Sequence, residues 1–218
     1  MLTLYGVYRS RASRPLWLLA EGGLPFTHVP VIQGYRLADP AAGDAQLNTA
    51  SAAYLAVNPM GQIPALTDDG VLLTESMAIT LHIAQQMGAP LGPRGVADAA
   101  VMANWAFFAA TSIEAAAIVI FYAHAEGRAG TPAGAAEIAA ATDRLARPLA
   151  RIEAHLTGRD WLLDRFTAAD ICVAECLRYA QGHAAFVAAY PASFAWLARC
   201  HARPAFQKMW AARLAEPA

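Results

Sequence analysis

Two neighbouring polar residues, Glu75 and Ser76, stand where a short apolar run ends and a helical pattern begins. At the start of a helix, the free backbone N–H groups and the positive end of the helix dipole attract an anion. An acidic group beside a hydroxyl at this point can hold an ammonium group and a carboxylate side by side. Ser76 alone could simply cap the helix, but the adjacent Glu75 favours a binding site.

A second candidate is the Ile63–Pro64 bond, which lies in a strand-like apolar run. Proline is awkward inside a strand because it cannot donate a hydrogen bond to the neighbouring strand. One interpretation is an edge-strand proline without a further role. The other is a cis peptide bond, which costs only about 0.5–1 kcal/mol before proline. The bond by itself leaves both interpretations open.

The elements that must position these residues alternate between strand and helix over residues 1–87. Asp68-Asp69-Gly70 predicts a hairpin turn, because Asp-Gly supplies the positive φ that tight hairpins need. Residues 33–51 form a long polar loop, and such loops are often functional. Strands joined through a helix are expected to be parallel, whereas the hairpin adds an antiparallel pair. The expected strands are residues 2–7, 27–32, 63–66 and 71–74, with helices ending at Gly22-Gly23 and spanning Ser76–Met87.

The rest of the chain is expected to be helical. Residues 88–95 are rich in Pro and Gly and form a linker. The sequence thus predicts an α/β domain over residues 1–87 and an all-α domain over residues 96–218. Thr167 and Asp170 have the spacing of a capping box, with Phe166 placed to pack on Ile171, which is a structural motif. The expected helices are residues 96–125, 132–156, 168–183, 191–199 and 204–214.

Composition restricts the class of protein. The formal net charge is −1, from 16 basic and 17 acidic side chains, so no nucleic-acid partner is expected. Three cysteines without an extracellular spacing pattern indicate a reducing compartment. With no secretion signal at the N-terminus, we expect a cytoplasmic location. Cys172 and Cys176 lack matching metal-ligand partners, so we expect buried packing and no metal.

Residues 99–125 form an apolar stretch that is long enough to span a bilayer, with Glu114 as its only acidic residue and no Lys or Arg. A charge near the centre of a membrane span is costly. A helix that is apolar nearly all round can instead be buried between its own domain and a partner subunit. We therefore expect no membrane span, and a homodimer in which this helix and the Ser76–Met87 helix meet their counterparts.

Four motifs follow one another along the chain. They are Leu4-Tyr5 with Arg9-Ser10, Asn58-Pro59-Met60-Gly61-Gln62-Ile63-Pro64-Ala65-Leu66, Leu73-Thr74-Glu75-Ser76 and Phe166-Thr167-Ala168-Ala169-Asp170-Ile171. In this order they resemble the glutathione transferase family over essentially the whole chain, closest to its bacterial, serine-type, zeta- and theta-like classes. The resemblance implies a thioredoxin-like α/β domain that binds glutathione, followed by an all-α domain. It also implies a cis Ile63–Pro64 bond.

The resemblance implies a catalytic role for Ser10. Catalysis in this family lowers the pKa of the glutathione thiol, because the thiolate is the nucleophile. A hydroxyl that donates to the sulfur near a helix N-terminus stabilises that charge, and Arg11 can add a positive field. Ser13 is the alternative sulfur contact, although the following Arg14-Pro15 gives it the pattern of a helix cap. Tyr5 and Tyr8 are further alternatives.

The remaining glutathione contacts are also implied by the resemblance. Glu75 and Ser76 would bind the γ-glutamyl end of glutathione. The cis bond would turn the backbone of Ile63 toward the peptide backbone of glutathione. Gln62 occupies the position that faces the glycyl end in relatives, or else is a solvated turn residue.

The function that follows is conjugation of the glutathione thiolate to a hydrophobic electrophile, in detoxification. Glutathione-dependent peroxide reduction at the same site, or a binding and regulatory role with little turnover, are the alternatives. Arg11 and Ala12 differ from the Ser and Cys of the serine isomerase class, which argues against isomerisation. A pocket for the second substrate is expected between the domains, with Trp105, Phe108 and Ser112 as candidate lining residues.

Overall fold

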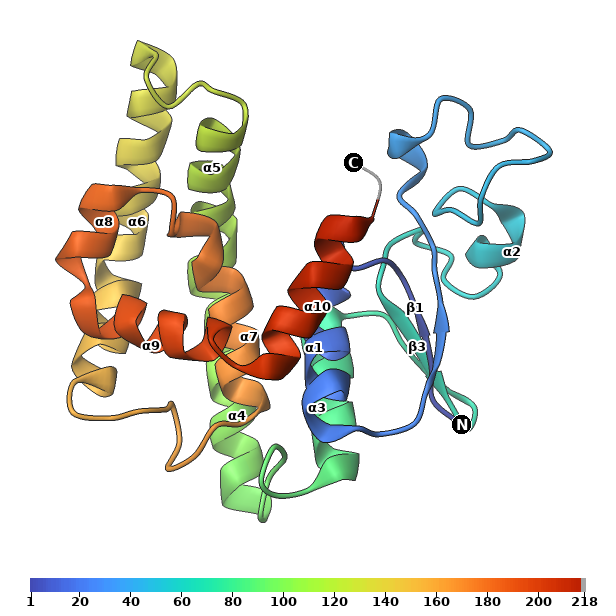
Figure 1. Ribbon diagram of the computed structural model, residues 1–218, viewed down its shortest axis with the longest axis horizontal. Helices are drawn as coiled ribbons and strands as arrows, with labels where there is room; N and C mark the ends of the chain where they lie inside the picture. Colours follow the sequence, from blue (N-terminus) through green and yellow to red (C-terminus); the bar gives the residue numbers. More distant parts are fainter. Residues whose placement is uncertain (217–218) are drawn as a thin grey trace. The chain divides into compact units, whose positions relative to one another are not determined.

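The computed structural model describes residues 1–216 (Figure 1). The chain divides into two compact units. The first unit comprises Met1–Met87 together with the chain from Pro204, and the second comprises Gly88–Arg203. The sequence analysis instead grouped residues from 204 onward with the helical domain.

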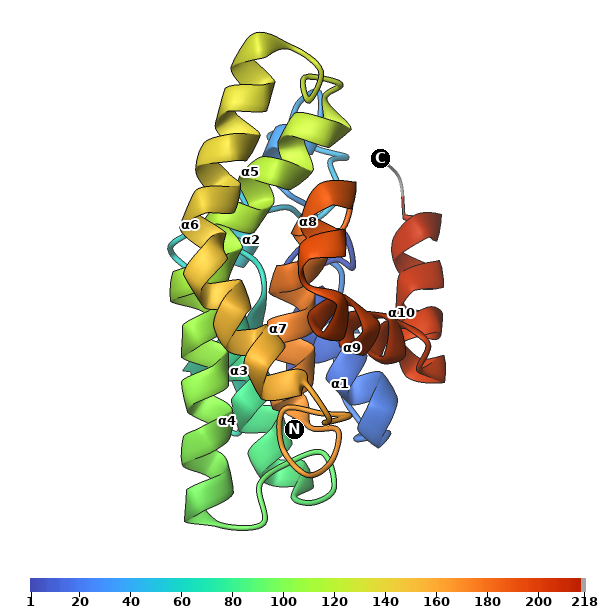
Figure 2. The same ribbon diagram turned by 90° about the vertical axis from the view of Figure 1, so that its left-hand side faces the viewer.

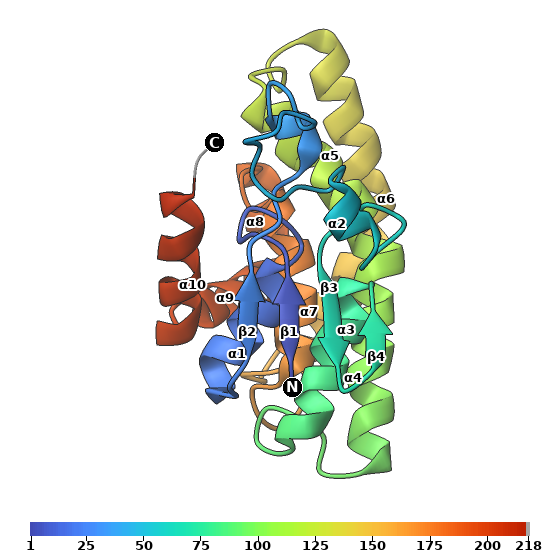
Figure 3. The same ribbon diagram turned by 90° about the vertical axis from the view of Figure 1, so that its right-hand side faces the viewer.

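A four-stranded sheet forms the centre of the first unit, in the order β2-β1-β3-β4 (Figure 3). β1 pairs with β2 in parallel and with β3 antiparallel, and β3 pairs with β4 antiparallel. The parallel pair and the hairpin were both predicted. The strands are shorter than expected, because the ladder ends where a neighbouring strand no longer pairs. They are β1 Thr3–Tyr5, β2 Thr27–Val29, β3 Ala65–Asp68 and β4 Val71–Leu73.

The hairpin turn between β3 and β4 has the predicted conformation. Asp69 has φ 44° and Gly70 has φ 89°. Both residues thus occupy the positive-φ region that a tight two-residue hairpin requires.

Helices α1 (Ser13–Gly22) and α3 (Ser76–Met87) pack together on one face of the sheet (Figures 1 and 3). α3 has the predicted bounds. Helix α10 (Pro204–Ala215) packs against α1, where the rings of Trp17 and Phe206 meet edge to face at 4.8 Å. This aromatic contact buries both side chains, which explains why α10 groups with the first unit. Short helical turns at Gly34–Arg36 (η1) and Ala52–Leu55 (α2) were not predicted.

The second unit is all-helical, with α5 packed along α6 and α4 against α7 (Figure 2). α6 has the predicted bounds, and Thr131 caps it by accepting a hydrogen bond from the Gly134 N–H at 3.1 Å. The elements are α4 Val96–Phe108, α5 Glu114–Ala125, α6 Pro132–Leu156, α7 Ala168–Leu177, a 3-10 turn η3 Arg178–Ala180, α8 Ala184–Ala189 and α9 Pro191–His201.

The long apolar helix expected over residues 96–125 is interrupted. A π-helical turn, η2 (Ala109–Ile113), separates α4 from α5. By length and composition, the combined run Val96–Ala125 is long and apolar enough to cross a membrane, with a mean hydropathy of 1.8. Of its most apolar stretch of 18 residues, 44% is buried within the structure. Core helices of soluble proteins pass the same test, so the run is weak support for a span.

The capping box at the start of α7 is confirmed. The Thr167 side chain accepts from the Ala169 N–H, and the Asp170 carboxylate accepts from the Thr167 N–H at 2.9 Å. Asp170 also accepts from the Leu162 N–H and the Trp196 indole N–H, both at 3.0 Å. Burial raises the pKa of Asp170 to about 6, against the opposing effect of these hydrogen bonds. Cys172, Cys176 and Cys200 are buried, and for Cys172 and Cys176 this is the expected packing position.

Candidate functional site

The end of β1, the start of α1 and the Ile63–Pro64 bond converge around Gly6. Gly6 has φ 140°, a backbone conformation that residues with a side chain rarely adopt. A Cβ there would lie 3.0 Å from the Cβ of Ala12, 3.5 Å from the Cβ of Ile63 and 3.6 Å from the Cα of Pro64. The absence of a side chain at Gly6 therefore allows the turn that carries Ser10 to lie against the predicted peptide-binding bond.

The Ile63–Pro64 peptide bond is cis, as predicted. Pro64 directly precedes β3, which lies between two other strands, so it is not an edge-strand proline. The carbonyl of Gln62 is fixed in place, since it accepts from the Tyr54 hydroxyl at 2.6 Å and the Asn58 amide at 2.7 Å. The side chain of Gln62 itself is exposed.

The turn before this bond depends on a second glycine, Gly61, with φ 59°. A Cβ at Gly61 would lie 2.7 Å from the carbonyl oxygen of Thr49, closer than real Cβ contacts allow. Any other residue would have to move the backbone of Thr49. Gly61 therefore fixes the approach of the chain to the cis bond.

The start of α3 has an exposed Glu75 and a buried Ser76. The Ser76 hydroxyl accepts a hydrogen bond from the Arg14 guanidinium at 2.8 Å. Arg14 comes from the first turn of α1 and is only 2% exposed. The arrangement places a guanidinium group, a hydroxyl and a helix N-terminus together, each of which favours a bound carboxylate.

Ser10 lies in the turn between β1 and α1, and it is half-buried. Its hydroxyl donates to the Val7 carbonyl at 2.6 Å and accepts from the Ala12 N–H at 3.0 Å. Only the donated bond would have to change for the hydroxyl to donate to another acceptor. The accepted bond polarises the O–H and makes it a better donor.

Ser13 and Arg11 lie on either side of the start of α1. The pattern of a helix cap at Ser13 proved misleading: Ser13 is the first residue of α1, and the cap position is Ala12, without a side-chain hydrogen bond. The side chain of Ser13 is fully buried, whereas that of Arg11 is exposed.

Burial and the negative charge of Glu216 raise the pKa of Tyr8, so its phenol is held in the neutral form.

The three candidates for the second-substrate pocket have different environments within the second unit. Trp105 is buried, and Phe108 is half-buried at an edge-to-face distance of 5.7 Å from it. The Arg151 guanidinium carbon lies 4.8 Å from the Trp105 ring centroid and 4.2 Å from that of Phe108. Ser112 is exposed in the π-helical turn and lines a hollow of about 300 Å³ with Arg144.

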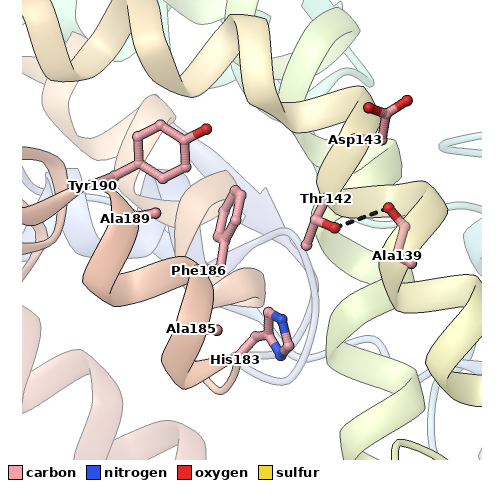
Figure 4. Close-up of a pocket in the computed structure, with 8 residues that line it drawn as sticks. All are labelled: Ala139, Thr142, Asp143, His183, Ala185, Phe186, Ala189 and Tyr190. Atoms are coloured by element: carbon pink, nitrogen blue, oxygen red, sulfur yellow. Dashed lines mark hydrogen bonds between the residues drawn. The ribbon is translucent and has the colours of Figure 1, made fainter.

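Another hollow, of about 460 Å³, lies between α6 and α8 (Figure 4). The rings of Phe186 and Tyr190 stand 5.0 Å apart on one side, and the Thr142 hydroxyl on the other donates to the Ala139 carbonyl at 2.9 Å. None of the predicted site residues lines this hollow. Among residues 1–216, no group of three or more His, Cys, Asp or Glu side chains could hold a metal ion.

Comparison with known proteins decides the family. Residues 8–86 match the model of the glutathione S-transferase N-terminal domain, and residues 97–204 match that of the C-terminal domain. The chain is 34% identical to glutathione S-transferase 3 of Zea mays, over 97% of this chain and 94% of the relative. The chain belongs to the glutathione S-transferase family.

Solved structures of glutathione transferases share the fold. Glutathione transferase F7 from Populus trichocarpa is 30% identical, with a TM-score of 0.76 over 98% of this chain and 99% of that one. A glutathione S-transferase-I bound with lactoylglutathione is 27% identical, with a TM-score of 0.77 over 97% of this chain and 99% of that one. The predicted fold, a thioredoxin-like unit with an all-α unit, is thereby confirmed. The zeta- or theta-like subclass stays a prediction.

Two residues of this glutathione transferase that contact the candidate site, Arg14 and Glu216, were not among the predicted site residues. Arg14 gave a local signal, since it is the one charged residue in the first turn of α1. Glu216, whose carboxylate accepts from the backbone of Tyr8 and Arg9, gave none. Its partner residues lie more than two hundred positions away in the sequence.

Proposed function

We propose that this transferase conjugates the glutathione thiolate to an apolar electrophile, with Ser10 as the donor to the sulfur. The observation that carries the proposal is the pair of hydrogen bonds at the Ser10 hydroxyl. Its oxygen is held by the Ala12 N–H, while its proton is donated to a carbonyl that the sulfur can replace. Each unit by which the bound thiol pKa falls represents about 1.4 kcal/mol in favour of the thiolate.

The reaction then follows from the stabilised thiolate. Glutathione loses its thiol proton to solvent, and the Ser10 O–H turns from the Val7 carbonyl to the sulfur. The sulfur forms a bond to the electrophilic carbon, while a halide leaves as the anion, or an epoxide C–O bond opens and its oxygen takes up a proton from solvent. The serine itself stays uncharged throughout and forms no covalent bond.

The rest of glutathione is bound by the groups around α3 and the cis bond. Glu75 supplies the counter-charge for the γ-glutamyl ammonium group. The γ-glutamyl carboxylate meets the Ser76 hydroxyl and the first N–H groups of α3, with the Arg14 guanidinium behind them. The backbone of Ile63 pairs with the peptide of glutathione, and Gln62 faces the glycyl end.

We also propose a homodimer and an apolar second substrate, both supported by the run Val96–Ala125. Large apolar side chains on this run remain exposed, among them Phe107 at 64% and Tyr122 at 48%. Exposed aromatic side chains of this kind are enriched at subunit interfaces and binding pockets. Sedimentation should show a dimer at micromolar concentration, and a monomer alone would contradict this part.

The function is tested by retention on immobilised glutathione followed by activity measurements. The protein should be retained and eluted by free glutathione, while cysteinylglycine, which lacks the γ-glutamyl group, should elute it poorly. It should then conjugate glutathione to chloroaromatic or epoxide substrates, with hydroperoxides as the comparison. Retention without turnover of any substrate would contradict the proposed reaction, and no retention would contradict the proposed site.

A further inference from the structure

The turn that carries Ser10 is tied to the end of α10 by a carboxylate. Glu216 Oε1 accepts from the Tyr8 N–H at 2.8 Å, and its Oε2 accepts from the Arg9 N–H at 2.7 Å. These distances are typical of charge-assisted hydrogen bonds. All three residues belong to the first unit.

Further bonds join the same two segments. The Arg213 guanidinium donates to the Tyr8 carbonyl, and the Arg9 Nε donates to the Arg213 carbonyl at 3.1 Å. On the other side of the turn, the Gln33 side-chain amide donates to the Arg9 carbonyl at 3.0 Å. The peptide groups of Tyr8 and Arg9 are thus held by side chains from distant parts of the chain.

This bonding decides where the Ser10 hydroxyl lies. Residues 8 and 9 connect Val7, whose carbonyl accepts from Ser10, to Ser10 itself. If the peptide groups of residues 8 and 9 rotate, the distance between the Val7 carbonyl and the Ser10 Oγ changes. Glu216 offers each of two successive N–H groups its own charged oxygen, whereas an amide has a single, neutral acceptor oxygen for both.

We propose that Glu216 is a positioning residue for Ser10: it holds the Tyr8–Arg9 turn so that the Ser10 hydroxyl can turn from the Val7 carbonyl to the glutathione sulfur. This inference rests on the proposed role of Ser10. The negative charge of Glu216 acts in the opposite direction, because a nearby carboxylate disfavours a thiolate. The two N–H groups that donate to Glu216 partly offset that charge, and the proposal requires the positioning effect to be the larger of the two.

The test compares Glu216→Ala, Glu216→Gln and the control Leu214→Ala. Leu214 lies two residues before Glu216, in the last turn of α10, and is 63% exposed. The measurements are the pKa of the bound glutathione thiol, from thiolate absorbance against pH, and kcat and KM for glutathione. Thermal unfolding of each variant shows whether it folds.

Glu216→Ala should raise the bound thiol pKa by about half a unit to one unit. It should lower kcat by between about three- and thirtyfold, because a small misplacement of a reacting group is costly. The KM for glutathione should change less than about twofold, since the contacts at Glu75, Ser76 and Ile63 are unaltered. Glu216→Gln keeps one acceptor oxygen and should be intermediate, while Leu214→Ala should match the parent protein.

An unchanged or lowered thiol pKa in a folded Glu216→Ala would overturn the inference, since a merely structural role leaves the titration unmoved. The same titration of Ser10→Ala separates the two claims. If Ser10→Ala shifts the thiol pKa and Glu216→Ala does not, only the positioning role fails. If neither variant shifts it, the proposed role of Ser10 fails first.

Discussion

Two turns of this transferase lead into helices and carry hydroxyl side chains, Thr167 and Ser10. The two hydroxyls differ in their burial and in their hydrogen-bond partners. In the second unit, Thr167 and Asp170 form a closed box that is fully buried at the start of α7. In the first unit, Ser10 is half-buried before α1, and its hydroxyl is bonded only to backbone groups of its own turn. Both satisfy backbone groups that a helix start leaves without partners.

The difference shows what separates a structural hydroxyl from a reactive one. Every partner of Asp170 is itself buried, so exchanging one partner leaves an unsatisfied polar group. The partners of Ser10, Val7 and Ala12, are buried as well, but Ser10 itself is half-buried and the adjacent Arg11 is exposed. The proposed exchange of the Val7 carbonyl for a ligand depends on this access from solvent. The proposed distinction between the two hydroxyls thus depends on the burial of each side chain, which the residue type alone does not show.

The largest expected effect is on the free energy of unfolding, at the capping box formed by Thr167 and Asp170. Asp170→Ala removes the acceptor for the Thr167, Leu162 and Trp196 N–H groups and should lower the free energy of unfolding by about 3–5 kcal/mol. Chemical denaturation with near-ultraviolet detection measures it. Asp160→Ala, at an exposed carboxylate in the loop before α7, is the matched control and should cost less than about 0.5 kcal/mol. Equal stability of the two variants would contradict the structural role.

The next effect concerns binding in the first unit. Glu75→Ala should weaken glutathione binding about tenfold or more, because truncating one member of a charged pair loses roughly 1.5–3 kcal/mol. The free energy of unfolding should stay unchanged, because Glu75 is exposed. Calorimetric titration with glutathione measures the loss, with Glu126→Ala, at an exposed carboxylate of the second unit, as a charge-matched control. Equal affinity in Glu75→Ala and the parent protein would show that the γ-glutamyl site lies elsewhere.

The smallest effect is expected at Ser13, which lies close to Ser10 but is fully buried. Ser13→Ala should behave like a structural position and cost about 1 kcal/mol of stability, through the loss of a buried hydroxyl. Its glutathione titration should match that of the parent. A shifted thiol pKa in Ser13→Ala would assign the sulfur contact to Ser13 instead and break the comparison.

Local signals predicted much of the fold. The bounds of α3 and α6 follow from residues beside the helices, such as Thr131 and Pro132 at the start of α6. The hairpin follows from Asp69-Gly70, and the capping box from Thr167 and Asp170. The strands were overestimated, because their ends depend on pairing with neighbours. The helix α8 and the interruption Ala109–Ile113 depend on packing, and no local residue pattern marked them.

The candidate site was predictable in part for the same reason. The cis Ile63–Pro64 bond follows from a proline beside a strand together with the motifs around it. Two sets of hydrogen bonds at the site join residues that are remote in the sequence. One links Arg14 to Ser76, and the other links Glu216 to the backbone of the turn that carries Ser10. A single sequence contains no signal for such pairs, since either member alone is typical of a surface or a helix start.

The most direct test of the account is the pH titration of bound glutathione in Ser10→Ala, followed by thiolate absorbance. The variant should bind glutathione with the affinity of the parent, because Glu75, Ser76 and the Ile63 backbone are untouched. The bound thiol pKa should rise, and the rate at neutral pH should fall by about one to two orders of magnitude, as expected for the loss of a charge-assisted hydrogen bond. An unchanged titration in Ser10→Ala would contradict the central claim that this hydroxyl stabilises the thiolate.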